Sequence, residues 1–258
     1  MVYRPVVPNG APCWVDLWTS DVEGSRHFYC DLFGWQAGEP SSDHGGYFMF
    51  TRAGAPVAGA MGDMGDTPAD DTWKPYFASE NVERTLELAV ARRAEVRQAG
   101  TAIGDLGHQA VIVDPAGAVT GIWQPGTFPG FTVIYEDATP SFIAIDVCDY
   151  DAEIAFYRQV FGWHPLEEEV DGHHYAGYMD PVSNRPIAGI GDEAESLAPG
   201  ESPQWSVFWQ SDDVDASVAK LRAIGGSVII EPADGGLGRV ARVADPSGAR
   251  FCIFEPKG

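Results

Sequence analysis

Three side chains that could do chemistry stand at every second position near the start of the chain. Trp14, Asp16 and Trp18 lie in WVDLWTS, whose β-branched and aromatic residues predict a strand. Side chains two apart on a strand share a face. In one interpretation the indoles stack on a flat ligand and Asp16 accepts a hydrogen bond or a proton. In the other, Trp14 fills space and backbone amides hold Asp16, because a carboxylate is rarely buried without a partner.

The second half of the chain contains a related segment with its acid in another place. FIAIDVC predicts a strand along which Phe142, Ala144 and Asp146 alternate. Its acid stands one step further along the strand than Asp16 does. We therefore expect the two segments to differ in chemistry, with one binding a ligand and the other only scaffolding it.

Histidine is the second candidate for proton transfer, because its imidazole titrates near neutral pH. His173 and His174 in DGHHYAGYMD precede a predicted strand, and one of them is expected to turn inward beside Tyr175. We take Asp16 and His174 as candidate catalytic residues. The alternative is a hairpin whose histidines face solvent, since loops at strand ends are mostly exposed.

Further polar and aromatic residues alternate along other predicted strands. Lys74 precedes Tyr76 by two residues in WKPYFAS. Lys74 could anchor an anionic or carbonyl group, or it could lie at a strand end and extend to water. The candidate substrate-binding residues are Trp14, Trp18, Tyr47, Lys74, Tyr76, Phe142, Asp146, Tyr175, Ser206 and Phe208.

Three motifs recur in the same order and at nearly the same offset. FYCDLFGW (28–35) matches FYRQVFGW (156–163), PVAG (56–59) matches PIAG (186–189), and DPAG (114–117) matches DPSG (245–248). A period this long indicates two copies of a whole domain. We assign residues 1–11 to an N-terminal extension, 12–126 to module 1, 127–139 to a linker and 140–258 to module 2.

Each module contains the same order of elements twice: a strand, a helix and three strands. Asp21 starts the first helix, with Ser20 and Glu23 as a predicted capping box, and Gly34 ends it. The aromatic residues of FYxxxFGW are expected to pack this helix onto the sheet. VERTLELAVARRAEVRQAG and VDASVAKLRAIGG predict the second helix of each module, both ending in glycine. The chain is thus predicted to contain four βαβββ units.

The composition narrows the classes of partner. The 258 residues carry 38 acidic and 16 basic side chains, a net charge of −22. Such a surface repels phosphate backbones and anionic lipids, so we expect neither nucleic acid nor membrane as a partner. No apolar run is long enough to span a bilayer, no signal peptide is evident, and the cysteine spacing predicts no disulfide framework or zinc site. A cytoplasmic location is expected.

The four units, FYxxxFGW after the first helix and DPxG before the last strand resemble the vicinal oxygen chelate superfamily. This superfamily includes glyoxalase I, extradiol dioxygenases, fosfomycin-resistance enzymes and bleomycin-resistance proteins. The resemblance covers residues 12–126 and 140–256. The chain looks most like the tandem actinobacterial form, which is glyoxalase-like, 27 kDa antigen-like or labelled as a polyketide-cluster hydroxylase. The resemblance implies an α+β fold of two cupped, mixed β-sheets with helices outside and a ligand cavity within.

Metal-dependent members of that superfamily hold a divalent ion through His, Glu or Gln on the first, fifth and eighth strands of a module, or on the fourth strand as well. The fourth strands here, VAGAMG and IAGIG, contain neither His nor Glu. Apart from a single cysteine, the residue types at the other positions do not suit such an ion. We therefore predict no cofactor, with a divalent metal expected only if these positions are misassigned. The positions are Trp14, Lys74 and Gly121 in module 1, and Phe142, Ser206 and Cys252 in module 2.

The leading hypothesis is a metal-independent protein that binds, or also modifies, an aromatic or polyketide-like small molecule in an aromatic-lined cup. Binding alone would resemble drug sequestration by bleomycin-resistance proteins. An enzymatic form would use Asp16 or His174 as the base, with Tyr or Lys stabilising an enolate. The alternatives are a metal-dependent lyase, isomerase, dioxygenase or hydroxylase, and a non-catalytic interaction protein with a filled cup. We expect a monomer whose modules form a pseudo-dimer, or a homodimer.

Overall fold

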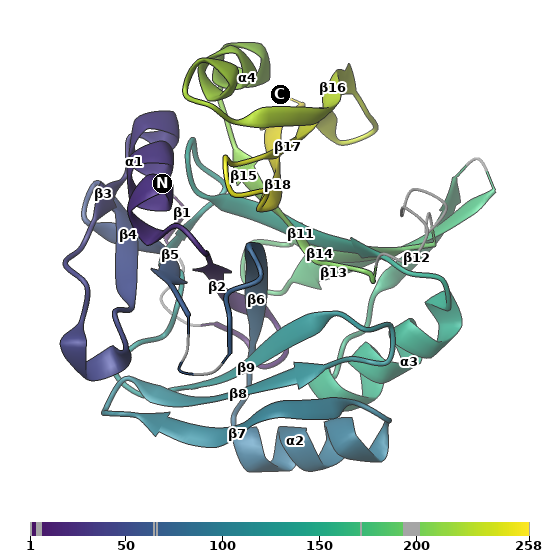
Figure 1. Cartoon of the computed structure of the whole chain (residues 1–258). Helices are drawn as coiled ribbons and strands as arrows, with labels where there is room; N and C mark the ends of the chain where they lie inside the picture. The colour runs from purple at the N-terminus through teal and green to yellow at the C-terminus, as the bar shows by residue number, and fades with distance from the viewer. Residues whose placement is uncertain are drawn as a thin grey trace.

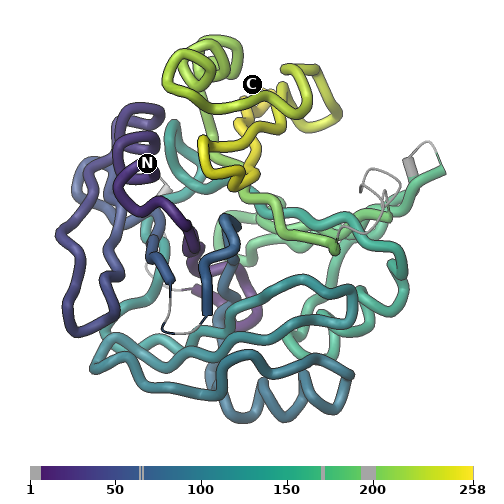
Figure 2. Tube along the Cα trace, viewed as in Figure 1, coloured from purple at the N-terminus to yellow at the C-terminus, as the bar shows by residue number. Residues whose placement is uncertain are grey.

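The computed structural model describes residues 2–3, 7–63, 65, 67–170, 172–192 and 202–257. These residues form two eight-stranded mixed sheets with four α-helices on their outer sides (Figure 1). The chain completes the first sheet before it enters the second, as the colour gradient of Figure 2 shows. The predicted α+β fold of two tandem modules is therefore confirmed, while the exact domain limits stay predictions.

Sheet 1 contains the strands of module 1 in the order β3-β4-β5-β2-β6-β9-β8-β7. Its central strand β2 pairs in parallel with β5 and antiparallel with β6, which places Asp16 opposite Gly59 on one side and Lys74 on the other. The elements of this module are β2 (Pro12–Trp18), α1 (Val22–Phe33), β3 (Gln36–Ala37), η1 (Ser42–His44), β4 (Phe48–Arg52), β5 (Ala55–Met61), β6 (Thr72–Ala78), α2 (Val82–Ala91), β7 (Glu95–Ile103), β8 (Gly107–Val113) and β9 (Val119–Pro125).

Sheet 2 repeats this order with β12-β13-β14-β11-β15-β18-β17-β16. A separate two-stranded sheet pairs β1 (Val2–Tyr3) with β10 (Val133–Ile134), which lies in the predicted linker. The elements of module 2 are β11 (Pro140–Asp146), α3 (Tyr150–Phe161), β12 (Leu166–Val170), β13 (His173–Asp180), β14 (Arg185–Gly191), β15 (Ser206–Gln210), α4 (Val214–Ala223), β16 (Ser227–Asp234), β17 (Gly238–Ala244) and β18 (Arg250–Pro256).

Helix α1 begins and ends where the sequence predicts, but a different residue caps it. The Asp21 side chain accepts a hydrogen bond from the backbone N–H of Gly24, and Gly34 ends the helix with a left-handed φ of 69°. Ser20 bonds instead to Asp71: the Asp71 carboxylate accepts a hydrogen bond from the backbone N–H of Ser20 at 2.7 Å. The predicted capping box is therefore wrong, because a neighbouring loop takes the Ser20 side chain.

Helix α2 is shorter than predicted. It ends at Ala91, and Arg93 adopts a φ of 72° that a continuing helix does not allow. The residues that follow, Glu95–Ile103, form the edge strand β7. The sequence prediction extended the helix into this strand because its mixed polar pattern, exposed along most of an edge, lacks the alternation of a half-buried strand.

The repeated FYxxxFGW strings join the two modules. Tyr29 donates a hydrogen bond to Asp245 in the DPSG turn of module 2, with an O–O distance of 3.1 Å. Tyr157 donates to Asp114 in the DPAG turn of module 1 at 3.0 Å. Each string thus contacts the turn motif of the other module, in addition to packing its own helix. The duplicated motifs form a reciprocal seam, which we call the module seam.

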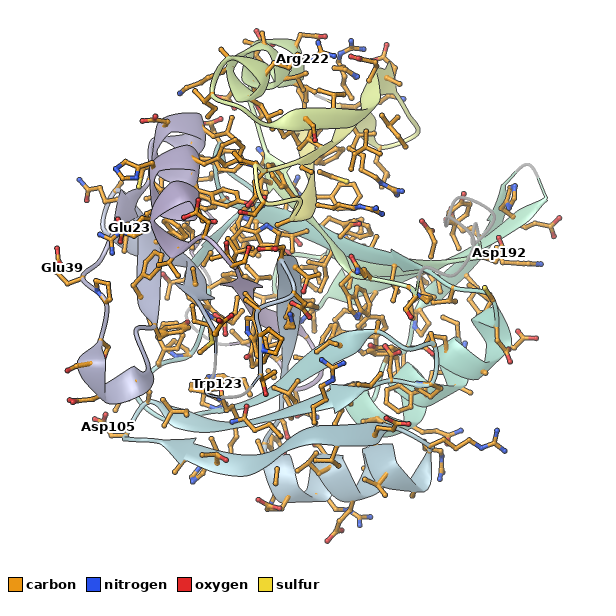
Figure 3. All side chains as sticks on the ribbon, viewed as in Figure 1. Glu23, Glu39, Asp105, Trp123, Asp192 and Arg222 are labelled. Atoms are coloured by element: carbon orange, nitrogen blue, oxygen red, sulfur yellow. The ribbon has the colours of Figure 1, made fainter. Side chains whose placement is uncertain are left out.

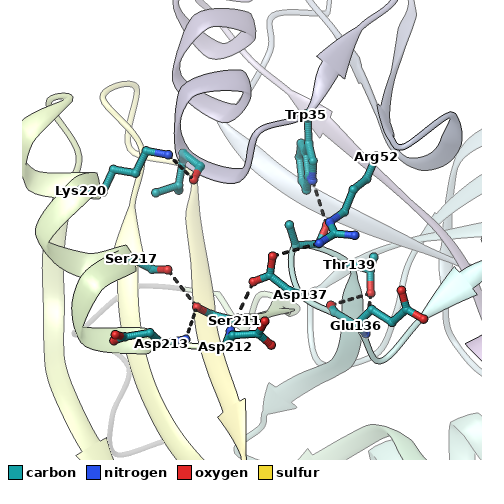
Figure 4. Close-up of polar contacts among 12 residues, drawn as sticks. Trp35, Arg52, Glu136, Asp137, Thr139, Ser211, Asp212, Asp213, Ser217 and Lys220 are labelled. Atoms are coloured by element: carbon teal, nitrogen blue, oxygen red, sulfur yellow. Dashed lines mark hydrogen bonds and ion pairs between the residues drawn. The ribbon is translucent and has the colours of Figure 1, made fainter. Parts of the chain in front are cut away.

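The indoles of the same strings fix the connecting segments. Trp35 donates to the carbonyl of Ala138 in the linker at 2.8 Å, next to an ion pair from β4 to the linker (Figure 4). Trp163 donates to the carbonyl of Gly10 in the N-terminal extension at 2.7 Å. These contacts hold the two cups in a fixed relation to each other.

Candidate functional site

The concave side of sheet 1 encloses a cavity of about 830 Å³. This volume lies in the range of small-molecule sites. The exposed residues of its lining, which we call the mouth, come from the β3–β4 segment with η1, the loop after β5 and the β7–β8 hairpin. In Figure 3, Trp123 lies inside the molecule while Glu39 and Asp105 stand at its left edge. Aromatic and apolar side chains make most of the wall: Trp14, Trp18, Phe48, Met49, Met61, Ile103, Leu106, Trp123 and Phe128.

A carboxylate lies on the inner surface of this cavity. Asp16 is 4% exposed, and its Oδ1 accepts hydrogen bonds from the Trp14 indole and the Tyr47 hydroxyl, each at 2.9 Å. A further hydrogen bond comes from Tyr76. The partners are side chains that line the same cavity, rather than the backbone amides of the alternative interpretation. The structure therefore brings together four of the residues that the sequence selected.

Burial and hydrogen bonding act in opposite directions on this carboxyl. Desolvation raises the pKa of Asp16 from 3.8 to about 6, and the hydrogen bonds, together with the charge of Lys74, keep the rise from being larger. Burial and the neighbouring Asp16 charge raise the pKa of Tyr47 and of Tyr76 well above 10. At neutral pH the site thus holds an ionised carboxylate beside two protonated phenols.

Lys74 lies behind the wall of the cavity. It is 2% exposed, its Nζ stands 4.2 Å from the centre of the Trp18 ring, and it donates to Thr72 at 2.6 Å and to Asp70. It does not line the cavity and it does not extend to water, so neither interpretation of Lys74 holds. A buried ammonium held in this way supports the Trp18 wall and adds a positive charge opposite Asp16.

Several wall residues were not among the candidates from the sequence, and Trp123 and Phe128 are two of the aromatic ones. Trp123 shares the inner face of β9 with Gly121, so the period of two along that strand could have identified it. Phe128 comes from the predicted linker and packs edge-on against Trp14, with ring centres 4.9 Å apart. No local pattern places Phe128 in the cup, because only the return of the chain toward β10 brings it there.

The second cup has its own set of side chains. Phe142 packs edge-on against Phe208 at 5.4 Å between ring centres, and its ring covers Gly189 closely. Asp146 and Ser206 line a cavity of only about 50 Å³. Tyr175 and Asp146 both lie over Gly191 of strand β14. Of the module 2 candidates, Asp146 and Ser206 line this small cavity, whereas Phe142 and Phe208 pack against each other.

His174 lies outside both cups. Its side chain is exposed and its ring contacts Tyr150 of helix α3, with ring centres 5.7 Å apart. Alternation along β13 places it on the face opposite Tyr175, and His173 bonds to Asp192 at 3.2 Å. The expected approach of His174 to the cup is therefore not observed, because the strand register turns it toward the helix.

The residues at the positions that correspond to the superfamily's metal ligands do not suit a divalent ion. Strand register places Trp14, Tyr76 and Gly121 in one row across β2, β6 and β9, so Tyr76 rather than Lys74 stands at the fifth-strand position. The Tyr76 ring covers Gly121. Indole and glycine offer no ligand to such an ion. Over the described ranges, no three His, Cys, Asp or Glu side chains group as metal ligands.

None of the described helices is long and apolar enough to cross a membrane.

The sequence of this chain is similar to the sequences of known proteins. Residues 140–253 match the family model of the Glyoxalase/Bleomycin resistance protein/Dioxygenase superfamily. The protein CFP32 of Mycobacterium tuberculosis is 34% identical over 262 residues, covering 99% of this chain and 98% of its own length. The anthracycline biosynthesis protein DnrV of Streptomyces peucetius is 31% identical, covering 95% of this chain and 93% of its own.

Solved structures share the fold. The Mn(II)-bound glyoxalase of Novosphingobium aromaticivorans superposes with a TM-score of 0.66 at 14% identity, covering 96% of this chain and 82% of that one. The 2,3-dioxygenase LapB of Pseudomonas sp. KL28 gives a TM-score of 0.65 at 14% identity, covering 98% and 94%. At this identity the likeness concerns the arrangement of strands and helices, and not the chemistry of the site.

Proposed function

Because the chain belongs to the glyoxalase/bleomycin resistance protein/dioxygenase superfamily, we propose that module 1 binds a planar aromatic, polyketide-like small molecule and that Asp16 exchanges a proton with it without a metal. The observation that carries this proposal is a buried carboxylate inside an aromatic-lined cavity of about 830 Å³. A relative named for anthracycline biosynthesis supports a polycyclic aromatic ligand. The residues at the positions of the superfamily's metal ligands do not suit a divalent ion, which supports proton transfer by the protein's own side chains.

The polar groups of the site suit proton abstraction next to a carbonyl. In this proposal Asp16 takes a proton from a carbon beside a ligand carbonyl, and the electron pair moves to the carbonyl oxygen. The hydroxyls of Tyr47 and Tyr76, which stay protonated, then donate to the oxyanion. Trp14 holds Asp16 in place through its indole N–H.

The first test measures binding to the full chain. Tryptophan fluorescence is followed while 1,8-dihydroxyanthraquinone is added, since several tryptophans line the cavity. Loss of a hydrogen bond to a charged group costs about 1.5–3 kcal/mol, so Asp16→Asn is expected to weaken binding roughly tenfold or more. Asp146→Asn, the matched change in module 2, is expected to leave binding unchanged. Absence of quenching in the wild type, or equal weakening by both variants, would contradict the proposal.

The second test separates proton transfer from binding alone. Deuterium incorporation from solvent at the carbon beside the carbonyl of 1-tetralone is followed by NMR. The rate is expected to rise as pH increases through about 6, because Asp16 must be ionised to act as a base, and to fall to the buffer rate in Asp16→Asn. Binding of the anthraquinone without any catalysed exchange would contradict the acid–base part and leave a binding protein.

A further inference from the structure

The charged side chains around the cavity of module 1 are nearly all of one sign. Glu39, Asp43 and Asp63 line its mouth from three separate segments, namely the residues after β3, the η1 turn and the loop after β5. All three are exposed. Among the described residues the lining contains no Lys or Arg, and its one histidine, His44, is tied to Ser41 through a contact of 2.9 Å between Nδ1 and Oγ.

The acidic composition of the chain does not by itself explain this distribution. The second cup has the same fold and belongs to the same acidic chain, yet Arg242 and Arg250 line its small cavity. Arg242 lies 3.7 Å from Asp146, so charges of both signs meet there. The cavity lining is therefore acidic in module 1 and of mixed charge in module 2.

The carboxylates at the mouth are not neutralised by neighbouring cations. Within the described part of the chain, no Lys, Arg or His forms an ion pair with Glu39, Asp43 or Asp63. Like charges that share one opening add their potentials over a screening length of about 10 Å at moderate salt. Asp16 adds a fourth negative charge at depth when it is ionised, which the buried Lys74 opposite it partly offsets. The mouth therefore attracts cations and repels anions.

We propose that the ligand of module 1 is cationic, with a planar aromatic body inside the cup and an amine at the mouth beside Glu39, Asp43 and Asp63. This inference rests on the proposed function and specifies its ligand class. The aromatic walls hold the apolar body, and the exposed carboxylates select its charge. Planar compounds that carry a carboxylate or a phosphate bind more weakly because of repulsion.

The test compares three probes that share one ring system: 2-(aminomethyl)anthraquinone, 2-methylanthraquinone and anthraquinone-2-carboxylate. Their dissociation constants for the full chain are measured by tryptophan quenching at low and at high salt. We expect the amine to bind about tenfold more tightly than the neutral probe at low salt, since each exposed pair contributes up to about 1 kcal/mol. The carboxylate should bind most weakly, and high salt should reduce both differences.

A triple variant, Glu39→Gln with Asp43→Asn and Asp63→Asn, is expected to remove the preference for the amine and leave the neutral probe unchanged. The control triple variant removes the same number of negative charges at exposed positions of module 2: Asp151→Asn, Glu168→Gln and Glu169→Gln. It should retain the preference.

Equal binding of amine and neutral probe at low salt would overturn this inference alone. So would a preference that persists in the mouth variant, or one that the control variant also loses. Failure of all three probes to bind would overturn the proposed function as well.

Discussion

Asp16 makes the stability of the fold depend on pH. Its pKa is raised from 3.8 to about 6, so the folded chain retains a proton that the unfolded chain has already released in this range. The stability linked to Asp16 is therefore highest at low pH and is lost as pH rises from about 4 through about 6. One pKa unit corresponds to about 1.4 kcal/mol, so the full effect is about 3 kcal/mol.

Asp16→Asn is expected to remove this dependence, because the amide does not titrate. The free energy of unfolding is measured in urea at several pH values between 4 and 7.5. Relative to the wild type, the variant should gain up to about 3 kcal/mol as pH rises across this window and change no further above it. Parallel curves for the two proteins would show that Asp16 is not desolvated as the structure indicates.

Also at the scale of the residue, the residue type of Lys74 did not predict which groups it contacts. Lys74 was identified as a candidate anchor because it alternates with Tyr76 on one strand, and that alternation holds in the structure. Its ammonium nevertheless points to Asp70 and covers Trp18, since an acid supplied by the preceding loop compensates part of its desolvation. Burial lowers the pKa of Lys74, and the bond to Asp70 opposes that shift. Sequence alone does not specify such a partner.

At the scale of the element, the repeated P-V/I-A-G motif provides space on the concave face of each sheet. A Cβ atom added at Gly59 would lie 2.0 Å from the Tyr47 hydroxyl and 2.2 Å from Asp16 Oδ1. At the corresponding Gly189, a Cβ would lie 2.8 Å from the Phe142 ring. Glycine in strand β5 thus allows the Asp16–Tyr47 pair to lie directly on the backbone.

Gly59→Ala is expected to displace Tyr47 and Asp16 and so to weaken binding of the anthraquinone probe. Overpacking of this kind costs about 1–3 kcal/mol of stability. Gly177→Ala is the matched control, since its added Cβ would meet nothing closer than the Leu166 carbonyl at 3.9 Å. Both variants are compared by thermal unfolding and by quenching. Equal effects of the two substitutions would contradict the close approach at Gly59.

At the scale of the whole molecule, the module seam is symmetric in its tyrosines and asymmetric in its acids. Glu153 of α3 is 1% exposed beside Asp114, whereas Ser25 occupies the corresponding place in α1. Burial, and then the Asp114 charge, raise the pKa of Glu153 to about 10. Glu153 therefore stays protonated at neutral pH. The unfolded chain releases this proton above about 4.5, so the stability linked to Glu153 falls as pH rises toward 10.

Glu153→Gln is expected to weaken this dependence, because a neutral amide replaces a group that resists ionisation. The variant should gain stability over the wild type as pH rises from 6 to 9, by up to about 1.4 kcal/mol per pH unit. The measurement is urea unfolding across this range, with the exposed Glu168→Gln as a control for the loss of one charge. A constant difference from the wild type would contradict a protonated Glu153 in the seam.

The sequence by itself determined the duplication, the four βαβββ units, the α+β class and the strand face that carries Trp14, Asp16 and Trp18. These features follow from local patterns: alternation along strands, glycine at helix ends and repeated motifs. It also identified Asp16 together with the two tyrosines that donate to it. Its errors were local as well, in the extension of α2 and in the cap of α1, where competing patterns and a distant loop decided the outcome.

Only the tertiary structure decided where the large cavity lies and what each charged group contacts. The wall of the large cavity in module 1 includes Phe128, which returns from the linker, and rings that pack over glycines of other strands. His174 and Lys74 turned away from the site because of strand register and because Asp70 lies nearby. The partner of each repeated tyrosine lies in the opposite module. Contacts between segments far apart in the chain depend on how the sheets close, and no pattern within one segment encodes that closure.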